Sequence, residues 1–498
     1  MKLDRRDCLR LGAAVGAGAF FTGCDAIRSY THPPQPDSIK LPPGPVEPIA
    51  RLLNRVSFGP TPGEVARVAR LGVERYIDEQ LHPTDDEPAF LALRLRGIEA
   101  LHTQALELQD EPKHEVLRQL QKAAILRAVY SPHQLRERMV EFWSNHFNIY
   151  AHKGSGAYFK PTDELSVIRK HALDKFPDLL RASAHSPAML AYLDNQVNER
   201  KAPNENYARE LMELHTLGVH GGYTQRDVQE VARCFTGWTV ENRFLRPRGR
   251  FRFNPDLHDD GPKTVLGTRI PAGGGEKDAE RVLDILAKHS STARFIAYKI
   301  CRYFLGEAAK TWTAKLAEIY VQTGGDIKAM LRPLLLSREI LEGPPIIKRP
   351  FDYMVSALRA LNANTDADRP LQEHLAHMGQ PLYQWPMPDG YPDKTSAWTG
   401  SLLARWNFAT ALTTGKIAWT QVDLPGLIRL SHTAKEAEYA HTLIEIIFAL
   451  PADQDSLRAL RDRLARCLSQ SPRWSRKERP LLAETAALVL ASPEFQWR

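Results

Sequence analysis

Apolar residues recur every three to four positions along most of the chain, the spacing that predicts amphipathic α-helices. In the first half this pattern covers Glu87–Leu108, Lys113–Tyr130, Pro132–Phe147, Asp163–Leu173 and Pro203–Leu217. In the second half it covers Lys277–Lys288, Ser291–Leu305, Thr313–Gln322, Ile327–Leu336, Pro350–Leu361, Lys435–Ala449, Asp453–Ser469 and Glu478–Leu490. Strand-like alternation is confined to the region between Arg250 and Gly267, around the Asp260-Gly261 turn. The sequence therefore predicts an all-α fold with one small β-hairpin near residues 250–267.

Interruptions of this pattern suggest how the chain is divided. Residues 24–48 are rich in proline and predict an extended tether before the first helical pattern at Ile49. A long stretch of poor helical character, Gln380–Trp398, interrupts the second half. We expect a main helical domain at residues 49–430, with a C-terminal helical unit at 431–498 integrated with it.

The first 23 residues have the layout of a bacterial export signal. Arg5 and Arg6 precede Leu11–Phe21, an apolar run of small residues that is too short for a membrane anchor. The run leads to Cys24, whose setting resembles that of the acylated cysteine of bacterial lipoproteins. Residues 1–23 thus indicate a twin-arginine-type signal, and two outcomes stay open: lipid on Cys24, or simple cleavage. With Asp25 next to a lipidated cysteine, we expect the protein to be located at the periplasmic face of the inner membrane or in the cell envelope.

Composition narrows the range of partners. The chain has 498 residues, 43% of them apolar and 25% charged, as in an ordinary soluble globular protein. Its formal charge of +7 comes from 66 basic and 59 acidic residues, too small an excess to indicate a nucleic-acid partner. We therefore expect no nucleic acid as ligand, and contact with the membrane only through the N-terminal lipid.

Several ordered blocks resemble one bacterial family. They include Phe142–Phe147, Asn204–Gly218, Phe235–Trp238, His258–Lys263 and Lys348–Pro350. On these blocks the chain resembles the family catalogued as domain of unknown function 1800, along nearly the whole mature sequence. The resemblance implies an exported bacterial protein, often encoded beside a companion of unknown-function family 1501. It supplies no catalytic residues.

Candidate chemistry must therefore come from the residues themselves. Asn206, Glu210 and Glu213 share one face of the helix after Pro203, where their oxygens could reach one cation, with Arg209 beside them. Histidine nitrogens would complete a site for a divalent metal ion. The predicted polar pocket consists of Asn206, Arg209, Glu210, Glu213, His258 and Asp259, and the predicted metal ligands are Glu210, Glu213, His146 and His258. The alternative is a solvated helix face with an arginine–glutamate pair.

Aromatic residues in the Gln380–Trp398 stretch form a second candidate site. Tyr383, Trp385, Tyr391 and Trp398 would provide a platform for stacking flat ligands, or would simply seal the core. The HExxH, GxSxG and GxGxxG motifs are absent from the sequence. Two functions follow: a metal-assisted enzyme acting on an envelope substrate, or a non-catalytic lipoprotein or scaffold that docks a partner protein. The pattern leaves the cofactor unknown.

Overall fold

The computed structural model describes residues 32–34, 36, 39–84, 87–241, 249–431, 438–470 and 478–498, without the side chains of 467–470 and 478–480. The predicted signal peptide and Cys24 lie outside these ranges. The described chain is mainly helical with a few short antiparallel strand pairs, which confirms the predicted fold class. None of its helices is both long and apolar enough to cross a bilayer.

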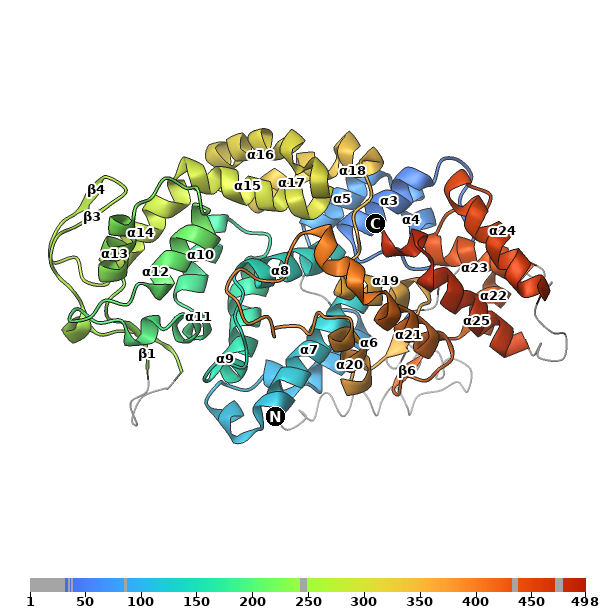
Figure 1. The fold of residues 1–498 in the computed structure, drawn as a ribbon, viewed down its shortest axis with the longest axis horizontal. Coiled ribbons are helices and arrows are strands. Elements are labelled where there is room, and N and C mark those ends of the chain that lie inside the picture. Colours follow the sequence, from blue (N-terminus) through green and yellow to red (C-terminus); the bar gives the residue numbers. More distant parts are fainter. Residues whose placement is uncertain are drawn as a thin grey trace, which may run out of the picture.

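Buried apolar side chains form two large clusters, which we call the first and second cores. The helices that contribute to the first core are α3 (Glu47–Val56), α4 (Glu64–Leu71), α5 (Val73–Leu81), α8 (Gln134–His146), α9 (Gly156–Asp163), α10 (Phe176–Ala184), α11 (Pro187–Tyr192), α12 (Asn206–Glu210), α13 (Gln225–Cys234), α14 (Lys277–Lys288), α15 (Ser290–Leu305), α16 (Lys310–Thr323), α17 (Ile327–Leu335) and α18 (Arg338–Glu342). In Figure 1 the α13–α14 region of this core lies at one end of the molecule.

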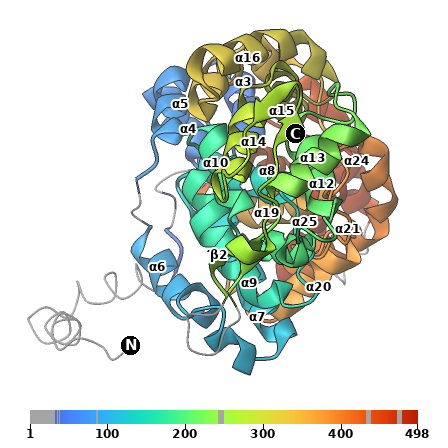
Figure 2. The same cartoon turned by 90° about the vertical axis from the view of Figure 1, so that its left-hand side faces the viewer.

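The second core draws on helices that are far apart in sequence. They are α6 (Ala89–Arg96), α7 (Lys113–Tyr130), α19 (Pro350–Ala360), α20 (Arg369–His377), α21 (Leu402–Thr413), α22 (Leu424–Leu430), α23 (Tyr439–Phe448), α24 (Asp455–Gln470) and α25 (Glu478–Ala491). Helices α22 to α25 lie at the end opposite α13 and α14 (Figure 1). Figure 2 looks along the molecule from the α12–α14 end.

The strand segments near residues 250–267 each pair with a neighbour in sequence. Strand β2 (Phe251–Phe253) pairs with β1 (Trp238–Val240), and β3 (Lys263–Val265) pairs with β4 (Thr268–Ile270). A third pair joins β5 (Asn364–Thr365) to β6 (Thr420–Gln421). The region thus holds two small antiparallel pairs, because Leu266-Gly267 adopts positive φ angles and turns the chain directly from β3 into β4.

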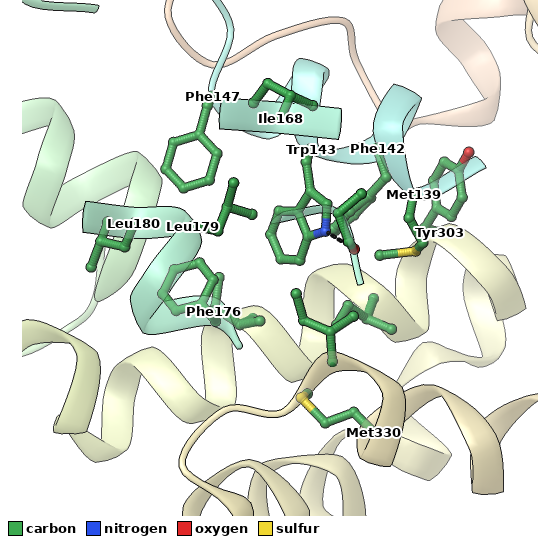
Figure 3. Close-up of a cluster of buried hydrophobic side chains, with 14 of the residues drawn as sticks. Met139, Phe142, Trp143, Phe147, Ile168, Phe176, Leu179, Leu180, Tyr303 and Met330 are labelled. Atoms are coloured by element: carbon green, nitrogen blue, oxygen red, sulfur yellow. Dashed lines mark hydrogen bonds between the residues drawn. The ribbon is translucent and has the colours of Figure 1, made fainter. Parts of the chain in front are cut away.

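Aromatic side chains fill the part of the first core that supports the candidate site. Figure 3 shows Trp143 of α8 among Phe147, Phe176 and Met330. The Trp143 indole N–H donates a hydrogen bond to the main-chain oxygen of Ala172 at 3.0 Å, which satisfies its one polar group. This contact holds α8 in position, so that the residues at its C-terminal end have a defined orientation.

Candidate functional site

The helix of Glu210 and Glu213 changes character at its centre. Helix α12 continues into a π-helical segment, Leu211–Thr216, and a second π-helical segment occurs at Glu164–Arg169. Tyr207 and Leu211 are buried, while Glu210 and Glu213 are only partly buried. π-Helical turns are uncommon and often mark functional sites, because the extra residue redirects the side chains that follow.

The two glutamates face the loop that follows α20. Burial, then the nearby Glu213 charge, raises the pKa of the Glu210 carboxyl; Asp389 of that loop adds to the effect and Arg209 opposes it. Glu213 accepts a hydrogen bond from the Tyr223 hydroxyl at 3.2 Å. The two carboxylates therefore lie near a third, that of Asp389, and none of the three forms a salt bridge within the described ranges.

Asn206 and Arg209 are engaged away from the two glutamates. Asn206 is exposed and donates its side-chain N–H to the main-chain oxygen of Leu193 at 3.2 Å. Arg209 Nη2 donates to Glu205 at 2.9 Å and to Gln225 at 3.0 Å. Arg209 thus forms an ion pair with Glu205, which resembles the alternative of a solvated helix face with an arginine–glutamate pair. Its partner is neither Glu210 nor Glu213.

His146 lies on the aromatic side of the same region. It is 2% exposed, and its Nε2–H donates to the main-chain oxygen of His215 at 3.1 Å. The ring centroids of His146 and His215 are 6.0 Å apart. Burial, and then the charge of Lys299, lowers the pKa of both histidines, to about 3 for His215. Both rings are therefore neutral members of the core at pH 7.

His258 and Asp259 belong to a separate buried ion cluster. His258 Nδ1–H donates to the Thr236 main-chain oxygen at 2.8 Å, and Nε2 lies 3.3 Å from an Asp278 oxygen. Lys263 Nζ donates to the same Asp278 oxygen at 2.5 Å. Arg233 Nε donates to Asp259 at 2.7 Å. These contacts fix the turn between α13 and β3, so their evident role is structural.

The four predicted metal ligands are thus distributed over different environments. In the described ranges, no group of three or more histidine, cysteine, aspartate or glutamate side chains is arranged to hold a metal ion. Glu210 and Glu213 face the loop, His146 is directed into the core, and His258 binds Asp278. The structure does not bring these four residues together as one coordination sphere, which would need ligand atoms near 2 Å from a shared ion.

The Gln380–Trp398 stretch, which we call the aromatic loop, mostly seals the fold. Tyr391 and Trp398 are 7% and 5% exposed and form a small cluster with Ile347 and the partly buried Trp385. The Trp398 indole N–H donates to the Pro392 main-chain oxygen at 2.9 Å. Tyr383 is directed inward, against the second core. These rings contact the protein itself, which favours sealing of the core over a platform for ligands.

A cavity of about 60 Å³ with both polar and apolar walls lies beneath this loop, and the sequence did not indicate it. Its polar wall residues include Arg127 of α7, Ser144 and Asn145 of α8, and Glu164 of the π-helical segment Glu164–Arg169. Ser144 donates to Glu164 at 3.0 Å, and Arg127 Nε is buried with no hydrogen-bond partner in the described chain. By volume the cavity has room for a few water molecules. Clustered polar residues in the Phe142–Phe147 block were the one available signal.

Together the fold and these sites define a class: a mainly helical protein with two cores, a small cavity under the loop and no assembled metal centre in its described part. The family described as "Protein of unknown function (DUF1800)" matches residues 51–497, and the chain belongs to that family. No curated protein and no solved structure matches the chain.

Proposed function

We propose that this chain is an exported cell-envelope protein that acts by docking a partner protein rather than by metal-assisted catalysis. One observation carries the proposal: a group of exposed apolar side chains on two adjacent helices. We call this group the docking surface; it consists of Leu402, Leu403, Trp406 and Leu488.

The docking surface draws on α21 and α25, which pack against each other. Leu402 and Trp406 are one turn apart on α21. The Trp406 indole N–H donates to the Ala491 main-chain oxygen of α25 at 3.1 Å, and Leu488 lies one turn before Ala491. Leu403 is 69% exposed and Trp406 is 48% exposed. Neighbouring exposed apolar side chains of this kind are typical of protein interaction sites.

The partner we propose is the companion of unknown-function family 1501. The family resemblance supports this choice, because its members are often encoded beside such a protein. Tryptophan and leucine side chains at a docking surface suit an apolar counterpart, since burying them removes apolar area from water. The alternative function, metal-assisted catalysis, has no comparable support in the positions of its proposed ligands.

Direct binding between the purified mature chain and the purified companion tests this proposal. We expect Leu403→Glu to raise Kd about tenfold or more, because a carboxylate would lose its water at the interface. Val321→Glu is the matched control, since Val321 is 64% exposed but lies on α16, away from the docking surface. Thermal unfolding of both variants checks that each is folded. Absence of binding by the unaltered chain, or equal affinity for Leu403→Glu, would overturn the proposal.

A further inference from the structure

Trp419, at 70%, has the most exposed indole among the side chains that the structure describes. Its φ is +60°, a left-handed conformation that a bulky residue rarely adopts because it strains the backbone. The Trp419 main-chain oxygen accepts the Asp366 N–H at 3.0 Å, and Thr420 pairs with Thr365 across β5 and β6. In Figure 1, β6 lies at the lower edge of the molecule. The strand pair thus holds the indole outward in a strained conformation.

A second exposed apolar side chain belongs to the helix beside this strand pair. Arg94 Nη1 donates to the Thr365 main-chain oxygen at 2.7 Å, so that α6 lies against β5. Leu93 precedes Arg94 in the sequence and is 51% exposed. Leu93 and Trp419 therefore belong to the same part of the surface, separate from the docking surface on α21 and α25.

Charged side chains near the two strands mostly pair with one another. Asp366 lies 3.7 Å from Arg94 Nε, and Asp423 lies 3.7 Å from Arg429 Nη2. Lys416, three residues before the indole, is exposed and forms no ion pair within the described ranges. The groups that remain available to a partner are thus apolar side chains and one ammonium group.

The N-terminal segment reaches the body beside the same strand pair. Pro33 is buried, and the Pro34 main-chain oxygen accepts a hydrogen bond from Asn362 Nδ2 at 3.4 Å, two residues before β5. Farther along the segment, Ile39 packs against the second core and Leu41 against the first. The predicted tether is therefore attached to the body at several points from Pro33 onward.

Little chain remains between these attachment points and Cys24. Pro33 is nine positions after Cys24, a stretch that spans at most about 32 Å when fully extended. A globular chain of this length is about 60 Å across. The tether is too short to reach around such a body. A bilayer that holds Cys24 must therefore lie on the side where Pro33 and the β5–β6 pair are found.

We propose that the β5–β6 pair presents Trp419, with Leu93 beside it, to the surface of the bilayer that anchors the chain. This inference rests on the proposed envelope location and goes beyond partner docking, because it assigns a lipid-contact surface. Tryptophan suits the head-group layer, where the ring is buried while its N–H bonds to water or lipid oxygens. Lys416 suits anionic head groups. The contact fixes the orientation of the body, which a tether alone cannot do.

Vesicles that capture the mature chain at its N-terminus test this contact. A hexahistidine tag in place of Cys24 binds a nickel-chelating lipid in vesicles of phosphatidylethanolamine and phosphatidylglycerol. Vesicles with and without brominated acyl chains are compared, since bromine quenches indoles that enter the bilayer. We expect brominated vesicles to quench the share of emission that one of the nine tryptophans contributes. Trp419→Phe should abolish this quenching.

Trp497→Phe provides the matched control. Trp497 is also exposed, at 39%, but its backbone pairs with Ile347 near the C-terminus, apart from β6. This variant should be quenched as much as the unaltered chain. Because the tag replaces the lipid, the result depends neither on acylation of Cys24 nor on binding of the companion protein.

A second variant separates the lipid contact from folding. Glycine adopts a positive φ without strain, so Trp419→Gly should unfold at no lower urea concentration than the unaltered chain. Its quenching by brominated vesicles should still be lost. If the unaltered chain is not quenched, or if Trp419→Phe is quenched as strongly, the proposal is wrong.

Discussion

The surroundings of His146 and His215 determine which chemical role each imidazole can take. Each could serve as a metal ligand, but both are at most 2% exposed and lie among aromatic rings such as Phe147. His146 Nδ1 and His215 Nε2 make no hydrogen bond within the described chain. Burial lowers the pKa of both imidazoles. The folded state therefore keeps both rings neutral at mildly acidic pH, at which the histidines of an unfolded chain would be protonated.

Acid should therefore weaken the fold through His215. Its pKa is about 3 in the folded chain and near 6.5 in the unfolded chain. As pH falls below 6.5, only the unfolded state gains the proton, so the free energy of unfolding decreases until pH approaches 3. Between pH 7 and pH 5 this loss is about 2 kcal/mol.

The variant His215→Gln should lack that loss. Urea unfolding at pH 7 and pH 5 measures the difference, which does not depend on any constant destabilisation by the substitution. His220→Gln, at an exposed position, should retain the unaltered pH dependence. An equal fall for His215→Gln and the unaltered chain would contradict a neutral buried His215.

At the scale of elements, the aromatic loop is positioned by α8 and the residues just after it. Asn145 Nδ2 donates to the Tyr391 main-chain oxygen at 3.1 Å, and its Oδ1 accepts the Tyr391 N–H at 2.7 Å. Asn148 Nδ2 donates to the main-chain oxygens of Trp385 at 3.0 Å and Met387 at 2.6 Å. The loop lacks regular structure, yet these side chains hold its backbone at fixed points.

Gly390 allows the close approach of loop and helix. Its φ is +75°, and an added Cβ would lie 2.3 Å from the Asn145 main-chain oxygen. We expect Gly390→Ala to lower the free energy of unfolding by more than about 1 kcal/mol and to expose the loop to proteases. Urea unfolding and limited proteolysis measure both effects.

Gly400→Ala provides the matched control in the same region. An added Cβ there meets nothing within 4 Å, and no positive φ is required. Its stability should change by less than about 0.5 kcal/mol. Equal behaviour of the two variants would mean that Gly390 does not hold the loop against α8.

At the scale of the whole molecule, the two cores share a charged boundary. Glu137 and Arg169 form a buried ion pair at 2.5 Å, and both line the cavity under the loop. Helix α7 of the second core and α8 of the first core both contribute walls to this cavity. This arrangement links the two cores through a buried ion pair.

Lipid on Cys24 would tether the protein to a membrane. We expect mass spectrometry of the mature N-terminus to find diacylglycerol on Cys24, because the preceding residues resemble a lipoprotein signal. Cys24→Ala should release the protein from the membrane fraction or leave it unprocessed. Cys8→Ala, within the signal, should mature normally. An unmodified N-terminus at another residue would contradict lipid anchoring.

Local sequence patterns predicted an element correctly where all the residues of the pattern lie within that element. The apolar spacing predicted the mainly helical fold, and Thr224 with Asp227 forms a capping box at the start of α13. At the start of α4, the main-chain N–H of Thr61 donates to the Glu64 carboxylate at 2.9 Å. Such signals depend on residues within a few positions, so the sequence alone contains them.

Sites formed between elements were decided only by the tertiary structure. Helical spacing placed Glu210 and Glu213 together, but His258 was drawn to Asp278 by the strand turn and His146 to His215 by core packing. The arginines around Tyr303 are Arg138 of α8, Arg349 just before α19 and Arg498, which no spacing relates. Sequence determines which side chains are available and which helix faces are apolar. Packing of those faces determines which polar groups meet. A buried charge is costly unless it is paired or hydrogen-bonded, and the neighbouring element supplies the partner.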